Sequence, residues 1–171
     1  AQIANGGYKI KPKIIVDNRP LSLEEAKKSM QDEQLHDSDK KLFKNKKNIK
    51  IVQEAIFSST NERFGTSYRS RIDNPKYQFA GKTGTAQVKR ISKRERELDL
   101  ELEQIPYKDR DHALYVAYGP YINPRYALSI IVEHGGSGSK AAAPIAKKLF
   151  KLIIDRHELR NKQLNFEEIS I

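Results

Sequence analysis

The sequence contains no cysteine, which excludes both a disulfide-stabilised scaffold and a zinc site built from thiolates. No apolar run approaches the roughly 20 residues of a transmembrane helix, and no signal-peptide pattern opens the chain. Hydrophobic residues make up only 37% of the 171 residues, and the mean hydropathy is −0.73. The length therefore fits one domain with a modest core.

The net charge is +10, from 32 Lys and Arg against 22 Asp and Glu. Such an excess suggests a basic module that binds nucleic acid or anionic surfaces. The charged residues are concentrated in residues 17–50 and 89–111, where both signs mix. Neither stretch shows the aromatic interleaving of a stacking platform. Solvated loops fit these stretches better, and no nucleic-acid partner is expected. A non-catalytic basic binding or scaffold module remains the alternative function.

Residues 80–88 carry the clearest chemical signal, because Lys82-Thr83-Gly84-Thr85 lies in a run that alternates like a strand. Such a strand offers an ammonium, two hydroxyls and backbone amides along one edge. These groups can hold a carboxylate and a developing oxyanion. Gly84 has no Cβ, so another backbone can approach closely.

A phosphate-binding loop is the first alternative for this segment, since Gly81-Lys82-Thr83 resembles the end of one. That motif requires a glycine five positions before the Gly-Lys pair. Position 76 is Lys76, and bulky residues follow it. The spacing argues against a phosphate loop.

The segments that follow are Gly119-Pro120, Asn-Pro-Arg-Tyr-Ala at 123–127, Glu-His-Gly-Gly at 133–136 and Ala-Ala-Ala-Pro-Ile-Ala at 141–146. With Lys-Thr-Gly they resemble, in order, the C-terminal part of the transpeptidase domain of class B penicillin-binding proteins of the elongation, rod-shape type. The resemblance runs from about Ala1 to about Ile154. It implies a partial penicillin-binding or β-lactamase-like fold, with no cofactor and no metal.

The resemblance further implies a peptidoglycan D,D-transpeptidase that cross-links the cell wall and binds the D-Ala-D-Ala stem peptide and β-lactams. Lys82 and Thr85 would be catalytic. Lys82, Thr83, Gly84 and Thr85 would bind substrate, and the Thr85 N–H would donate to the oxyanion. Membrane proteins of the elongation machinery would be partners. The location would be the periplasmic side of the bacterial inner membrane, with the anchor upstream.

The family's other two motifs, Ser-x-x-Lys with the nucleophile and Ser-x-Asn, have lookalikes at three serines. Ser38 lies in a charged stretch, Ser137 comes after the Lys-Thr-Gly strand, and Ser59 is too close to that strand. We reject all three. Ala1 to Gly7 resembles the end of a helix. We therefore expect a C-terminal fragment without its nucleophile, inactive alone.

The predicted fold class is α+β, an antiparallel sheet flanked by helices, with the domain at 1–160, charged inserts at about 17–47 and 90–111, and a tail at 161–171. Two apolar stripes at helical spacing are predicted to face the core. The apolar run 130–132 predicts a sheet covered on both faces. Expected strands are 8–16, 113–118 and 126–133, and residues 76–90 carry the Lys-Thr-Gly-Thr strand. Expected helices are 21–28, 48–58 and 142–157. The stripes are Ile49, Val52, Ile56, Phe57 and Ile145, Leu149, Leu152, Ile153.

His112 and His134 flank predicted strands. They lack the paired spacing of a metal motif, so we expect structural roles at strand ends.

Overall fold

A computed structural model describes residues 1–10, 43–90, 97–98 and 100–169 of the chain, with side chains described to residue 159. The chain divides into two compact units, Ala1–Gln53 and Glu54–Ile171. The predicted helix at 21–28, most of the predicted strand at 8–16 and the Ser38 motif lie outside the described residues.

In the first unit, turns at Ala1–Gly7 lie against the beginning of helix α2, which spans Lys46–Asn61. Ile49 is buried directly beneath Gly7, where a Cβ would lie 2.5 Å from the Ile49 side chain. The Gln53 amide donates a 2.6 Å hydrogen bond to the carbonyl of Ile3. Gly7 has φ +95°, a conformation that glycine adopts without strain.

The predicted apolar stripe of α2 is only partly confirmed. Ile49 is buried and Ile56 and Phe57 are half-buried, but Val52 is exposed. The physical reason is that the described apolar contacts of this helix lie near its two ends, so that its middle is left exposed. Ile49 contacts the Gly7 turn, and Phe57 packs against Tyr121 with ring centroids 4.1 Å apart and the rings tilted by 32°.

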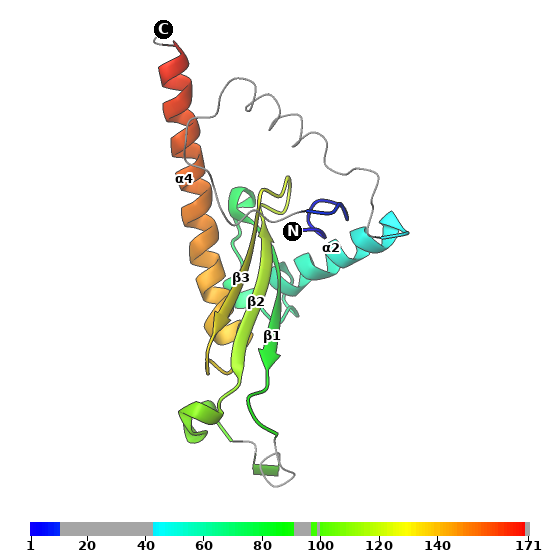
Figure 1. Ribbon diagram of the computed structural model, residues 1–171, viewed down its shortest axis with the longest axis vertical. Coiled ribbons are helices and arrows are strands. Elements are labelled where there is room, and N and C mark those ends of the chain that lie inside the picture. Colours follow the sequence, from blue (N-terminus) through cyan, green and yellow to red (C-terminus); the bar gives the residue numbers. More distant parts are fainter. Residues whose placement is uncertain (11–42, 91–96, 99, 170–171) are drawn as a thin grey trace. The chain divides into compact units, whose positions relative to one another are not determined.

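The described residues of the second unit are built on a three-stranded antiparallel sheet in the order β1-β2-β3. The strands are β1 (Ala80–Ala86), β2 (His112–Gly119) and β3 (Tyr126–Val132). Figure 1 shows helix α4 (Ala143–Ile169) running along one face of this sheet. The strand-turn-strand prediction for 113–133 is confirmed, with boundaries shifted by at most one residue.

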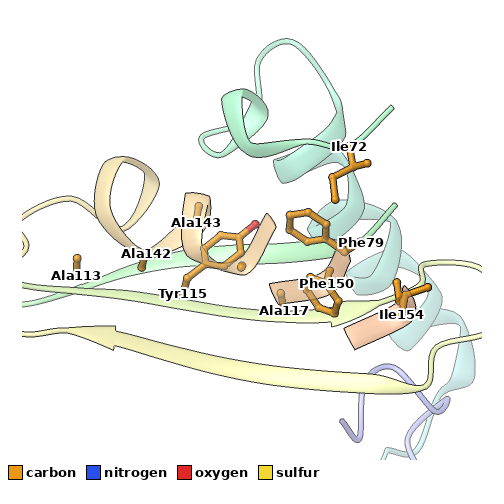
Figure 2. Close-up of a cluster of buried hydrophobic side chains, with 10 residues drawn as sticks. Ile72, Phe79, Ala113, Tyr115, Ala117, Ala142, Ala143, Phe150 and Ile154 are labelled. Carbon is orange, nitrogen blue, oxygen red and sulfur yellow. The ribbon is translucent and has the colours of Figure 1, made fainter. Parts of the chain in front are cut away.

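The core lies between the sheet and α4 (Figure 2). Phe79 and Phe150 stack at a centroid distance of 4.8 Å, and Tyr115 meets Phe79 edge to face at 6.5 Å. A π-helical turn, Gly138–Ala142 (η5), leads into α4. Small residues let the helix approach the strands closely; the buried ones are Ala113, Ala117, Ala142, Ala143 and Ala146.

The predicted stripe of the last helix is wrong. The buried face of α4 runs through Ala143, Ala146, Phe150 and Ile154, whereas Ile145, Leu149 and Leu152 are exposed and Ile153 is half-buried. Two apolar stripes compete on this helix, and the one rich in alanine allows close packing on the sheet. The helix also continues to Ile169, past its predicted end at 157 and through the expected tail.

The prediction that both sheet faces are covered is only partly confirmed for the part of the chain that the structure describes. On the face opposite Tyr115, Ala80 and Tyr118 at one end of the sheet are buried, but the rest of that face is not. Val116 is 52% exposed and Ile131 is 62% exposed, and both lie on the face opposite Tyr115. α4 and η5 cover only the other face. The apolar run 130–132 thus places one residue on the open face and two toward the packed one.

Candidate functional site

Among the described residues, β1 is an edge strand and no backbone pairs with its outer edge beyond Gly81. The Gly81 N–H donates to Thr60 Oγ1 and the Thr60 hydroxyl donates to the Gly81 carbonyl, each at 3.1 Å. The Gly81 backbone groups therefore point away from β2. Because backbone groups alternate in direction along an antiparallel ladder, the N–H and C=O of Thr83 and Thr85 also point outward.

The side chains of the Lys-Thr-Gly-Thr segment alternate between the two faces. Thr83 and Thr85 pair with Tyr115 and Ala113, on the face that η5 and α4 cover. Lys82 pairs with Val116, on the open face. Its ammonium nevertheless curls back over the strand edge, because Nζ lies 2.9 Å from the Thr83 carbonyl oxygen and 3.4 Å from the Thr83 hydroxyl.

Thr66 is a residue at this site for which the sequence predicted no role. Its hydroxyl lies 3.4 Å from the Thr83 hydroxyl and 3.3 Å from that of Ser59. Gly65 allows this approach, since a Cβ there would meet the Ser59 carbonyl at 2.4 Å. The Gly-Thr pair at 65–66 was the available sequence signal. One ammonium and three hydroxyls thus gather at one end of the free edge.

η5 supports the strand from behind. A Cβ on Gly138 would lie 2.4 Å from the Leu114 carbonyl oxygen and 2.8 Å from that of Gly84. Only glycine lets the turn press this closely against both strands. The Thr83–Thr85 edge is therefore held by direct backbone packing.

A groove of about 680 Å³ opens beside Thr85. Two short 3₁₀ helices in the β1–β2 connection, Leu102–Gln104 and Tyr107–Asp109, form one wall. Both positively and negatively charged side chains line the groove, and the Lys89 ammonium lies 3.3 Å from the Asp109 carboxylate. The other lining residues include Leu100, Ile105, Asp111, Gly135, Gly136, Ser137 and Lys140.

The rejected nucleophile motifs have different surroundings. Ser59 lies in α2 and contacts Thr66. Ser137 and Lys140 line the groove beside Thr85, so the structure brings this lookalike nearer the candidate site than its position in the sequence suggested. The Ser137 hydroxyl lies 3.0 Å from that of Ser139, and within the described residues Lys140 is not among its hydrogen-bond partners.

His112 and His134 meet where β2 begins and β3 ends. The His134 N–H donates a 2.9 Å hydrogen bond to His112 Nδ1, and His134 Nδ1 lies 3.0 Å from the Arg110 carbonyl oxygen. The rings are 4.8 Å apart. Across the described ranges no group of three or more His, Cys, Asp or Glu could hold a metal ion.

An ionic cluster fixes the approach to β1. Lys76 Nζ lies 2.7 Å from Glu158 and 3.1 Å from Asp155, and the Tyr77 hydroxyl donates to Asp155 at 2.5 Å. Hydrogen bonding with Glu158 first, then with Tyr77 and Asp155, holds the pKa of Lys76 above its ordinary value. The Tyr77 hydroxyl and the Lys76 ammonium lower the pKa of Asp155. The residues before β1 are thereby tied to α4.

The family model described as the penicillin binding protein transpeptidase domain matches residues 1–151. The chain belongs to this family. The family predicted from the sequence is therefore confirmed, and so is the α+β fold. No described helix of this transpeptidase-domain chain is long and apolar enough to cross a membrane.

Several relatives are named peptidoglycan D,D-transpeptidase MrdA. The protein of Salmonella typhimurium is 35% identical over 105 residues, 61% of this chain. That of Acinetobacter baumannii is 42% identical over 77 residues, 43% of this chain. The chain spans 16% of the length of the first and 11% of the second.

Solved penicillin-binding proteins share the fold. PBP2 of Pseudomonas aeruginosa, in complex with WCK 5153, is 26% identical with a TM-score of 0.57, covering 88% of this chain and 28% of its own. PBP2 of Helicobacter pylori, in complex with MreC, is 32% identical with a TM-score of 0.52. That match covers 64% of this chain and 18% of the other.

Proposed function

We propose that the chain is the C-terminal part of the transpeptidase domain of a peptidoglycan D,D-transpeptidase, and that the outer edge of β1 binds the D-Ala-D-Ala end of a stem peptide. One observation carries this proposal. The Lys82 ammonium and the Thr83 hydroxyl meet at a strand edge whose next outward backbone groups belong to Thr83 and Thr85. That edge suits a peptide that adds as a further strand.

Each residue of the segment has a chemical role in this proposal. Lys82 provides positive charge for the terminal carboxylate, and the Thr83 and Thr85 hydroxyls donate hydrogen bonds to it. The Thr85 N–H donates to the oxyanion of the tetrahedral intermediate. Loss of one such donor raises the barrier by about 3–4 kcal/mol. Gly84 leaves room for the ligand backbone.

We further infer that the acylating serine is not among these 171 residues. In the proposed reaction a serine attacks the D-Ala-D-Ala carbonyl, D-Ala leaves, and an amine from a second stem peptide resolves the acyl-enzyme. Ser137 fits this role poorly, because its hydroxyl faces Ser139 and its motif follows the Lys-Thr-Gly strand. The chain alone would then bind substrate without turning it over.

We also propose a membrane-associated partner and a periplasmic location for the protein. The Helicobacter pylori relative is a complex with MreC, which supports a membrane-associated partner of the elongation machinery. Relatives that act on peptidoglycan support a periplasmic location. We assign residues 1–160 to the domain, in keeping with the family match over 1–151.

Labelling with a fluorescent penicillin, combined with calorimetric titration of a tripeptide ending in D-Ala-D-Ala, tests both parts. We expect reversible peptide binding and no covalent adduct. A hydroxylamine-sensitive adduct on Ser137 would contradict the inference about the nucleophile. Salt-sensitive binding to DNA or acidic vesicles, without peptide binding, would favour the basic binding module.

A further inference from the structure

Three buried hydroxyls meet at the beginning of β1. Thr60 and Tyr115 are fully buried and Ser67 is 1% exposed. Thr60 Oγ1 lies 3.0 Å from the Tyr115 hydroxyl and 3.2 Å from that of Ser67. Ser67 and Tyr115 are 3.1 Å apart. The three come from the end of α2, the loop after it and β2, so the cluster joins segments far apart in the sequence.

The protons of this cluster can be assigned one by one. The Thr60 hydroxyl donates to the Gly81 carbonyl and accepts from the Gly81 N–H. The Ser67 hydroxyl donates to the Ser59 carbonyl. The Tyr115 proton then has the Thr60 or Ser67 oxygen as its acceptor. Each of the three hydroxyls thus has an acceptor for its proton, as a rigid polar cluster requires.

This arrangement occupies both backbone groups of Gly81. A strand that adds to β1 can pair with the outward groups of Thr83 and Thr85, but at Gly81 it meets the Thr60 side chain. Gly81 cannot be replaced without moving the cluster, because a Cβ would lie 2.3 Å from the Tyr115 oxygen. Tyr115 itself is fixed in the core (Figure 2).

We propose that Thr60, held by Ser67 and Tyr115, closes the free edge of β1 at Gly81 and so restricts the edge to the C-terminal end of a peptide. This inference rests on the proposed function. A docked peptide runs out of backbone partners after Thr83, where the Lys82 ammonium and the Thr66 and Thr83 hydroxyls lie. An extended peptide would have to displace Thr60. Thr60 is thus a positioning and specificity residue that need not touch the reacting atoms.

The test compares two ligands on the full chain: a tripeptide ending in D-Ala-D-Ala and the same peptide extended by two glycines. Thr60→Ala removes the hydroxyl and Thr60→Ser retains it, so these variants differ by one oxygen atom. Tyr115→Phe removes only the last donor of the cluster. Tyr118→Phe is the matched control on β2, because its buried hydroxyl has no hydrogen-bond partner among the described residues.

We expect the wild-type chain to prefer the unextended peptide by about tenfold or more, the equivalent of one hydrogen-bonded contact. Thr60→Ala should abolish most of this preference and speed amide exchange at Gly81 by about tenfold, while Thr60→Ser and Tyr118→Phe stay close to wild type. Tyr115→Phe should reduce the preference by about two- to threefold, since it spares both Gly81 bonds.

If the wild-type chain binds both peptides with equal affinity, the claim that Thr60 closes the edge of β1 is wrong, and the proposed function still stands. If neither peptide binds, the proposed function fails and the inference fails with it, even if Gly81 exchange is slow. If Thr60→Ala does not fold, Tyr115→Phe decides. An unchanged preference and unchanged Gly81 exchange in that variant would overturn the role of the cluster.

Discussion

The ammonium of Lys82 lies 2.9 Å from the carbonyl oxygen of Thr83, although the two side chains leave β1 on opposite faces. The long lysine side chain makes this possible by folding over the free edge of the strand. Positive charge and a threonine hydroxyl therefore meet where a ligand strand would add. An anionic group at the end of that ligand would replace the Thr83 carbonyl as the partner of the ammonium.

Replacing Lys82 should weaken binding of a peptide acid selectively. For Lys82→Met we expect an affinity loss of about tenfold or more for a peptide ending in D-Ala-D-Ala, because a charge-assisted hydrogen bond is lost. The corresponding peptide amide should bind the variant and wild type alike. Calorimetric titration of both peptides measures the difference.

Lys148→Met provides the charge-matched control, since Lys148 is exposed on α4. It lowers the net charge by the same amount without touching β1. An equal affinity loss in the two variants would show that general electrostatic attraction, rather than a contact at Lys82, binds the acid.

Two glycines near the site should respond differently to alanine. Gly138→Ala places a Cβ 2.4 Å from a backbone carbonyl, which cannot move without shifting β2, so we expect a loss of about 1–3 kcal/mol in the free energy of unfolding. In Gly84→Ala the nearest atom is the Leu114 Cβ at 3.3 Å. That variant should lose peptide affinity with little loss of stability, as measured by urea denaturation and titration.

The packed face of α4 can be tested with two truncations. Phe150→Ala should lower the free energy of unfolding by about 3–5 kcal/mol, because the fully buried ring stacks on Phe79. Leu152→Ala removes a side chain that is 61% exposed and should change it by less than about 0.5 kcal/mol. If urea denaturation shows similar losses of unfolding free energy for both variants, the side of α4 that faces the sheet has been assigned incorrectly.

Alkaline pH should destabilise the fold through Tyr118. Burial, followed by the charge of Tyr121, raises its pKa from 10.0 to about 12. Between these values the unfolded chain releases the proton and the folded chain retains it, so the free energy of unfolding falls as pH rises. Tyr118→Phe should weaken that decline and have little effect below pH 10. Urea denaturation across this range measures it, with exposed Tyr107→Phe as the control.

Local patterns in the sequence predicted part of this structure. The β-branched and aromatic runs located β2 and β3, and Lys-Thr-Gly-Thr located β1 and the candidate site. The stripe of α4 was not predictable from hydrophobicity, because Ile145 and Leu149 are as apolar as the residues that pack. The alanine-rich stripe packs because the sheet lies close to the helix axis. The separation between sheet and helix is a property of the assembled core.

The cluster of hydroxyls at Thr60, Ser67 and Tyr115 could not be predicted from the sequence for a different reason. Thr60 and Tyr115 are 55 positions apart, and Thr60 and Ser67 lie in a polar stretch that is typical of a surface loop. Their burial depends on the way α2 ends against Gly81. Long-range polar contacts of this kind leave no periodic pattern in the sequence, whereas a strand or a helix does.

The most direct test of the account is an NMR titration of the isotope-labelled chain with a peptide ending in D-Ala-D-Ala. We predict that the amide signals of Thr83 and Thr85 shift most and become protected from exchange, while those on β3 stay unchanged. Binding that shifts β3 or α4 and leaves Thr83 and Thr85 unperturbed would contradict it.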